Sequence, residues 1–145
     1  MKIGIASDHR AYEAKQKVIK FLEKKGYNII DYGTDSLNSV DYPDYAFKVA
    51  NDVKNKKIDI GILMCANGIG MSIAANKVKT IRCAKVSSVK EAKHSKIDND
   101  CNMIALGGEQ SITKIKKIIL AFLKTDFSNE QRFIRRMGKI DNYEH

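Results

Sequence analysis

The chain has 145 residues, of which 43% are hydrophobic and 30% charged, and its formal net charge is +9. This length and balance exclude disorder and predict a single domain with a substantial core. No apolar run approaches the roughly 20 residues of a membrane span, and the strand-like start leaves no room for a signal peptide. Three dispersed cysteines without a C-x-x-C pair argue against a zinc knot or disulfide scaffold, so a reducing cytoplasm is expected.

Strand-like and helix-like segments alternate along the chain. Residues 2–7 read as a buried strand, and the apolar spacing over 11–25 predicts a helix that Gly26 ends. Four more strands are expected, over 27–32, 58–64, 82–86 and 102–106. Further helices are expected over 43–55, 72–77, 87–95 and 111–124. This alternation predicts an α/β fold: a single-domain, doubly wound, Rossmann-like, five-stranded parallel sheet.

The end of the chain is a separate short unit in this prediction. Ser128 to Gln131 match the S-x-x-Q capping box, which would open a helix through about Lys139. Arg132 and Arg136 then lie one turn apart on one face of that helix. We therefore divide the single domain 1–145 into an α/β core (1–125) and a C-terminal helical arm and tail (126–145). The arm is expected to reach a partner subunit.

The most informative segment is the apolar run that ends in Cys65 and continues as Asn67-Gly68-Ile69-Gly70. In parallel sheets, ligands bind beyond the carboxyl ends of the strands, where this thiol is expected. Backbone N–H groups of the following helix start would bind an anion and favour a thiolate. That pairing suits proton abstraction from a small phosphorylated or carbonyl substrate. The alternative is that Cys65 is a small buried hydrophobic residue.

Two other polar groups leave alternatives open. Asp8 and His9 follow the first strand and could hold a sugar hydroxyl and a phosphate, but Asp8 could equally cap the next helix and His9 could be an ordinary surface residue. Arg132 and Arg136 could clamp a phosphate, or they could form a solvated helix face.

The segment Asp98-Asn99-Asp100 reads as a polar turn, and His94, one helical turn earlier, as a proton donor or plain surface. The lysines fall mostly on helix faces, which favours solvated surface over nucleic-acid binding, because no basic tract is interleaved with aromatic residues.

Together these motifs resemble the type B ribose-5-phosphate isomerase family, which also contains the galactose-6-phosphate isomerase subunits. The resemblance covers nearly the whole chain and is most specific in its order over residues 68–77. It implies an aldose–ketose isomerase of the pentose phosphate pathway and carbohydrate metabolism, which interconverts ribose 5-phosphate and ribulose 5-phosphate through a cis-enediolate. It implies no metal and no other cofactor. The alternatives are an isomerase of a hexose 6-phosphate (allose- or galactose-6-phosphate type) and a non-catalytic sugar-phosphate-binding relative.

The same resemblance implies roles for individual residues. Cys65 would be the base, Asp8 and His9 would contact the substrate, and Asn99 would bind it. Arg132 and Arg136 would hold the phosphate. Backbone N–H groups would stabilise the enediolate, from Ala66, Asn67, Gly68, Ile69 and Gly70. The expected assembly is a cytoplasmic homodimer or dimer of dimers with sites at the subunit interface, and neither nucleic acid nor membrane is expected as a partner.

Several positions depart from the family pattern. Asp98 stands where the family has its ring-opening histidine; an aspartate is ionised at neutral pH, so it is a poor acid but could serve as a base. His94, one helical turn away, is the imidazole that could replace the missing one. Glu109 stands where a phosphate-binding arginine is expected and would repel a phosphate, and Phe133 replaces another histidine. We therefore expect proton transfer to be retained while substrate identity or efficiency has shifted.

Overall fold

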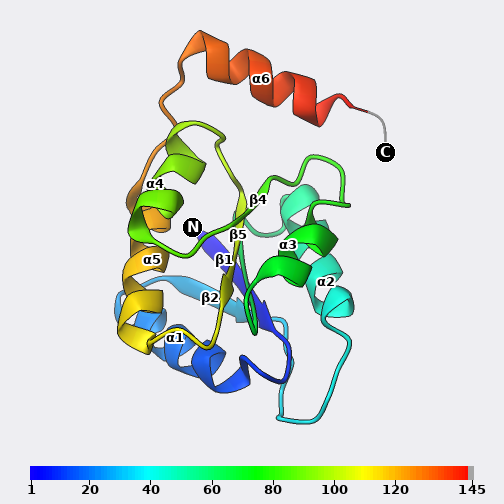
Figure 1. Ribbon diagram of the computed structural model, residues 1–145, viewed down its shortest axis with the longest axis vertical. Helices are drawn as coiled ribbons and strands as arrows, with labels where there is room; N and C mark the ends of the chain where they lie inside the picture. The colour runs from blue at the N-terminus through cyan, green and yellow to red at the C-terminus, as the bar shows by residue number, and fades with distance from the viewer. Residues whose placement is uncertain (144–145) are drawn as a thin grey trace.

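A computed structural model describes residues 1–143, which form one parallel sheet of five strands with helices on both faces (Figure 1). The strand order is β2-β1-β3-β5-β4, which confirms the predicted doubly wound α/β fold. The strands are β1 (Lys2–Ser7), β2 (Asn28–Asp31), β3 (Ile60–Cys65), β4 (Cys83–Lys85) and β5 (Met103–Gly107). The helices are α1 (Tyr12–Lys24), α2 (Tyr42–Lys54), α3 (Ile69–Ala75), α4 (Val89–Ile97), α5 (Ile112–Lys124) and α6 (Gln131–Asp141).

The sheet separates two hydrophobic clusters. Helices α1, α4 and α5 bury their apolar residues against one face, and α2 and α3 cover the other. The central strand β3 is buried along its whole length and serves both clusters, because successive side chains of a strand point to opposite faces. Ile62 and Met64 pack on the first side, whereas Leu63 and Cys65 pack on the side of α2 and α3. The register of β3 therefore sends the Cys65 thiol toward α3.

Two local predictions need correction. Helix α3 begins at Ile69 and not at residue 72, because Gly68 adopts a left-handed φ of +84° and turns the chain directly from β3 into the helix. The capping-box prediction is wrong. The Ser128 hydroxyl instead contacts the end of α4, where it donates to the Ile97 carbonyl oxygen at 2.9 Å. Helix α6 starts at Gln131, with Glu130 as an N-cap that makes no side-chain hydrogen bond.

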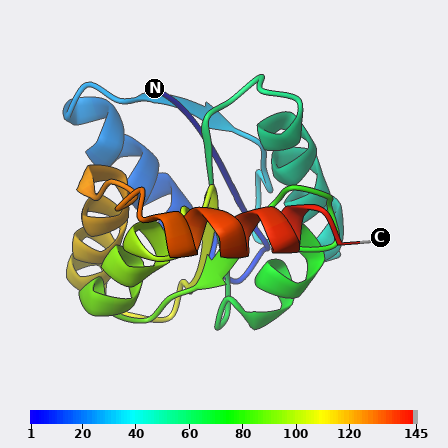
Figure 2. The ribbon, with the colours of Figure 1, turned by 90° about the horizontal axis from the view of Figure 1, so that it is seen from above.

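Helix α6 lies across the amino-terminal ends of β4 and β5, apart from the two helical layers (Figure 2). Among its residues, all of which the structure describes, only Met137 is buried, while Ile134 and Ile140 are exposed. The predicted tail extends to residue 145, and its residues 144 and 145 lie outside the described part of the chain. Within residues 1–143, no helix combines the length and the apolar character needed to cross a membrane.

Candidate active site

The Cys65 thiol lies at the carboxyl end of β3, 6% exposed, where its Sγ accepts the Gly68 N–H at 3.1 Å. Such a donor stabilises a sulfur anion. The turn depends on Gly68 twice over: its φ is left-handed, and a Cβ there would lie 2.9 Å from the Leu106 backbone. The register partner of Cys65 in β5 is Gly107, where a Cβ would lie 2.8 Å from the Ala66 carbonyl oxygen. The close approach of β5 therefore fixes the loop that holds the sulfur.

A cavity of about 470 Å³ opens beside this sulfur. Cys65 borders it together with Asp8 and His9, which follow β1, because β1 and β3 are neighbouring parallel strands whose carboxyl ends meet at one edge. The structure thus brings together most of the site residues expected from β1 and β3. The lining comprises Asp8, His9, Arg10, Val40, Tyr42, Cys65, Ala66, Asn67, Ile69, Gly70 and Ile73.

Asp8 and His9 each have a partner in the protein as well as a place at the cavity. One Asp8 carboxylate oxygen accepts the Ala11 N–H at 3.1 Å, so the residue supports the start of α1 while it lines the cavity. The His9 Nδ1 accepts the Val40 N–H at 3.2 Å. A neutral His9 ring must then carry its proton on Nε2, which is the nitrogen available to donate to a ligand.

The loop after Cys65 uses two of its N–H groups internally. Gly68 donates to the Cys65 sulfur, and Ile69 donates to the Asn67 side-chain oxygen at 3.0 Å. This bond fixes the orientation of the Asn67 side chain, and its amide nitrogen is the part that can donate to a substrate oxygen. The hydrogen-bond donors of residues 66–70 therefore divide into two sets: those that shape the loop and those that remain suited to a ligand.

The site candidates of α4, the loop after it and α6 lie at the opposite edge of the sheet, where the strands begin. Asp98 ends α4, and its carboxylate lies 3.4 Å from the Nδ1 of His94. Asn99 follows it in the loop that leads to β5, and α6 carries Arg132 and Arg136 over the same edge. Strands rise about 3.3 Å per residue, so β3 and β5 separate this edge from Cys65 by more than about 15 Å. One copy of the chain does not bring these residues to the Cys65 cavity.

Phe133 lies between the two predicted phosphate-binding arginines. The Arg132 guanidinium stands 4.6 Å from the centre of its ring and that of Arg136 5.7 Å, which is within the range of cation–π attraction. Arg132 also contacts the Glu130 carboxylate at 3.0 Å. The aromatic ring thus keeps both guanidinium groups on one side of α6.

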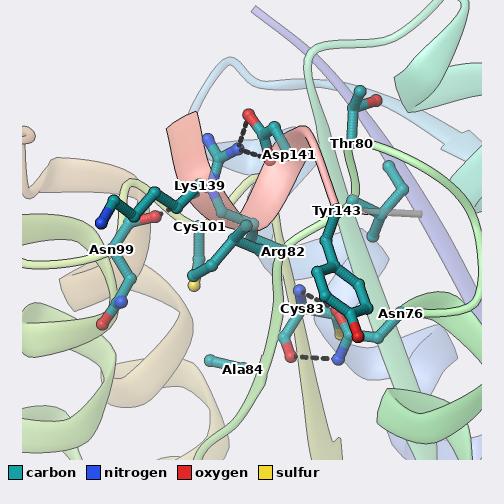
Figure 3. Close-up of a pocket in the computed structure, with 12 residues that line it drawn as sticks. Asn76, Thr80, Arg82, Cys83, Ala84, Asn99, Cys101, Lys139, Asp141 and Tyr143 are labelled. Atoms are coloured by element: carbon teal, nitrogen blue, oxygen red, sulfur yellow. Dashed lines mark hydrogen bonds and ion pairs between the residues drawn. The ribbon is translucent and has the colours of Figure 1, made fainter. Parts of the chain in front are cut away.

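A second cavity, of about 610 Å³, lies beneath α6 (Figure 3). Asn99 and Arg82 border it, as do the thiols of Cys83 and Cys101. Burial raises the pKa of Cys83, with Cys101 adding to the effect. Burial likewise raises the pKa of Cys101 to about 11, against the opposing influence of Arg82 and Lys96. Both groups are neutral thiols at physiological pH, as buried structural cysteines are.

Sequence reasoning did not single out Arg10, Tyr42 and Ile73 as cavity residues. Arg10 directly follows the Asp8-His9 pair, and Tyr42 directly precedes Pro43, near which the second helix is expected to begin. A Cβ at Gly70 would lie 2.7 Å from the Tyr42 hydroxyl oxygen, which shows how closely α2 and α3 approach beside the cavity. Glu109 is exposed after β5 and does not line this cavity.

Comparison with known proteins extends over nearly the whole chain. Residues 3–140 match the family described as Ribose/Galactose Isomerase. A ribose-5-P isomerase B of Listeria innocua is 37% identical over 142 residues, which cover 97% of this chain and 93% of that protein. The solved ribose-5-phosphate isomerase B of Clostridium thermocellum is 44% identical, with a TM-score of 0.94 and coverage of 97% of this chain and 95% of that one.

A further solved structure is that of ribose-5-phosphate isomerase B from Mycoplasma genitalium with bound ribulose-5-phosphate. It is 38% identical, with a TM-score of 0.93, and the match covers 98% of this chain and 95% of that one. Sequence and fold therefore agree over almost all of both chains, and this protein belongs to the ribose/galactose isomerase family.

Proposed function

We propose that this protein is an aldose–ketose isomerase that interconverts ribose 5-phosphate and ribulose 5-phosphate, with the Cys65 thiolate as the base. The observation that carries the proposal is the Cys65 sulfur, bonded by the Gly68 N–H and bordering a cavity shared with Asp8 and His9. The ribulose-5-phosphate bound to the Mycoplasma genitalium relative supports the choice of substrate.

In the proposed reaction, Cys65 moves one proton between two neighbouring carbons. The thiolate takes the proton from C2 of the open-chain aldose, and the electrons of that C–H bond form the C1–C2 double bond of a cis-enediolate. The C1 oxygen takes up the negative charge, and the proton of the C2 hydroxyl then passes to that C1 oxygen. The thiol returns its own proton to C1, and the oxygen on C2 becomes the ketone. The His9 Nε2–H and the Asn67 amide are the nearby donors suited to the developing oxygen charge.

Ring opening is assigned to Asp98 and His94 acting as a pair. The 3.4 Å contact between them supports this assignment, because a carboxylate beside an imidazole fixes the orientation of the ring. Asp98 alone would serve as a base on the anomeric hydroxyl, whereas protonated His94 would supply the proton that the ring oxygen needs. Unchanged turnover of a ring-closed substrate by a His94→Gln variant would remove His94 from the mechanism.

We also propose that two copies of the chain complete each site, in a cytoplasmic homodimer or dimer of dimers. Cys65 occupies the carboxyl edge of the sheet, whereas Asn99, Arg132 and Arg136 occupy the amino edge. Exposed apolar side chains flank both halves, which is typical of an interaction surface. These are Ile69 (50% exposed) and Ile73 (59%) beside the cavity, and Ile134 (44%) and Ile140 (51%) on α6.

Two alternatives keep specific support. Glu109, in the place of an expected arginine, favours a longer hexose 6-phosphate whose phosphate lies elsewhere. Asp98, in the place of an expected histidine, favours a relative that binds sugar phosphates without turning them over.

The proposal is tested by ketose formation from ribose 5-phosphate, allose 6-phosphate and galactose 6-phosphate. Wild-type protein should turn over the pentose best, and Cys65→Ala should lower kcat by about a thousandfold. Cys83→Ala, which removes a buried thiol away from the Cys65 cavity, is the matched control and should stay active. Full activity of Cys65→Ala would exclude the thiolate base. Preference for a hexose phosphate, or binding of all three sugars without turnover, would establish one of the two alternatives.

A further inference from the structure

The position of α6 depends on few contacts with the rest of the protein. Met137 is its one buried residue among those described, and the segment that joins it to α5 is largely exposed between residues 126 and 130. Its remaining apolar residues face solvent in part or in full, so packing alone gives the helix little anchorage. Within one chain, polar contacts must therefore fix where this helix lies.

Arg82 supplies those contacts. Its Nη1 donates to both carboxylate oxygens of Asp141, each at 2.7 Å, in the last turn of α6. Its Nε donates to the Asn99 carbonyl oxygen and its Nη2 to the Asp100 carbonyl oxygen, each at 3.0 Å. The side chain is only 15% exposed, and hydrogen bonds to a charged guanidinium strengthen when water is partly excluded. Figure 3 shows Arg82 directed at Asp141 beneath α6.

The base of the Arg82 side chain is itself held firmly. Its backbone N–H donates to the Asn102 side-chain oxygen at 2.9 Å, and its carbonyl oxygen accepts the N–H groups of Asn102 and Met103. These bonds fix Arg82 at the junction of β4 and β5, which belongs to the rigid sheet. One guanidinium thus joins the sheet, the loop that carries Asn99, and the helix that carries Arg132 and Arg136.

We propose that Arg82 is a positioning residue that sets the geometry of Asn99 relative to the two α6 arginines. This inference rests on the proposed function, because it assumes that these residues bind the sugar phosphate. A lysine could not replace Arg82, since one ammonium group cannot reach acceptors in two segments in the planar arrangement that the guanidinium provides. Of the acceptors of the Arg82 guanidinium, Asp141 is the one on α6. A substitution of Asp141 therefore changes the bonds to the helix and leaves the bonds to the Asn99 loop in place.

The test combines hydrogen exchange of α6 amides with steady-state kinetics on ribose 5-phosphate. Asp141→Asn should raise exchange over 131–141 about tenfold. It should also raise KM about fivefold with kcat changed by less than about twofold, because binding of the phosphate is loosened before the chemistry is reached. Arg82→Lys should raise KM and also lower kcat, because the Asn99 loop loses its bonds too. Asp141→Glu keeps a carboxylate and should restore most of the wild-type KM.

Lys85→Gln is the matched control, because it removes a positive charge from the strand that follows Arg82, and the Lys85 ammonium donates to the Ser87 hydroxyl and not to α6 among residues 1–143. It should leave exchange and KM unchanged. Unchanged exchange of α6 in both Asp141→Asn and Arg82→Lys would overturn the proposal, and so would faster exchange with an unaltered KM. If Arg82→Lys fails to fold, Asp141→Asn still decides, since Asp141 lies at the surface. A wild-type protein without isomerase activity would refute the proposed function, while the exchange data would still show whether Arg82 holds α6.

Discussion

At the scale of single residues, the candidate site depends on the turn at Gly68. We predict that Gly68→Ala destabilises the protein and removes most activity, because the added Cβ meets the Leu106 backbone and the turn must shift away from the sulfur. Gly26→Ala is the matched control: its φ is also left-handed, at +91°, but a Cβ there meets nothing within 4 Å.

The control isolates the conformational cost, which is about 1 kcal/mol. Thermal unfolding and isomerase kinetics of the two variants measure the difference. Equal losses of stability, together with full activity of Gly68→Ala, would show that contact with β5 does not matter to the loop.

Sequence reasoning reached the carboxyl-edge residues for a physical reason. Parallel strands end at a common edge, so the residues that follow β1 and β3 had to meet there, and Asp8, His9 and Cys65 do line one cavity. It did not find the bond from Val40 to His9, because that bond depends on how the 33–41 segment folds back over the sheet. Long-range loop contacts of this kind leave no periodic pattern in a sequence.

At the scale of elements, one ion pair joins α1 to β2. Lys15 is fully buried, and its Nζ lies 2.6 Å from the Asp31 carboxylate, which also accepts the Gly33 N–H. Partial burial acts to raise the pKa of Asp31, but the bonds from Lys15 and Gly33 outweigh it and hold that pKa below its ordinary value. The carboxylate therefore stabilises the fold at pH values above its unfolded pKa, and this contribution is lost as the pH falls through the folded pKa.

We predict that Asp31→Asn lowers the free energy of unfolding by about 2 kcal/mol at neutral pH, since it leaves the Lys15 ammonium buried without its counter-ion. This loss is smaller than for a fully buried pair, because the Asp31 side chain is 40% exposed. Lys15→Met keeps the side-chain volume and leaves only the half-exposed Asp31 carboxylate without its partner, so it should lower the free energy of unfolding by less than Asp31→Asn does. Denaturant unfolding between pH 3 and 7 should show a smaller acid-dependent loss in both variants than in wild type. An equal dependence of the unfolding free energy on pH in all three proteins would contradict the role given to Asp31.

Element boundaries show where sequence patterns and tertiary contacts compete. The hydrophobic period of residues 11–25 predicted α1 well, because residues spaced at helical intervals, such as Val18 and Leu22, form its buried face. The Ser128 capping box had the right residues but not the right partner, since the end of α4 offers the Ile97 carbonyl oxygen to the same hydroxyl. A local motif can be outcompeted by a contact 31 residues away.

At the scale of the whole molecule, the two halves of the candidate site lie at opposite edges of one sheet. We predict that mixing two inactive variants, Cys65→Ala and Arg132→Gln/Arg136→Gln, restores activity after the subunits exchange. Half of the pairs formed from equal amounts are mixed, and each mixed pair has one intact site out of two, so about a quarter of wild-type activity should return.

Two controls accompany that experiment: a sample that contains only one of the variants must stay inactive after the same exchange procedure. A mixture as inactive as its parts, in subunits shown to have exchanged, would mean that α6 and Cys65 do not serve one shared site. The sequence could indicate the arginines and the cysteine separately, but only the fold shows that one chain keeps them apart.

The most direct test of the central claim follows the proton itself. In deuterium oxide, an enediolate intermediate formed by Cys65 exchanges the transferred hydrogen with solvent, so NMR should detect deuterium at C2 of recovered ribose 5-phosphate and at C1 of ribulose 5-phosphate. Wild-type protein is predicted to incorporate deuterium at these carbons, and Cys65→Ala to leave both sugars without deuterium there. Incorporation by Cys65→Ala at the wild-type rate would contradict the account.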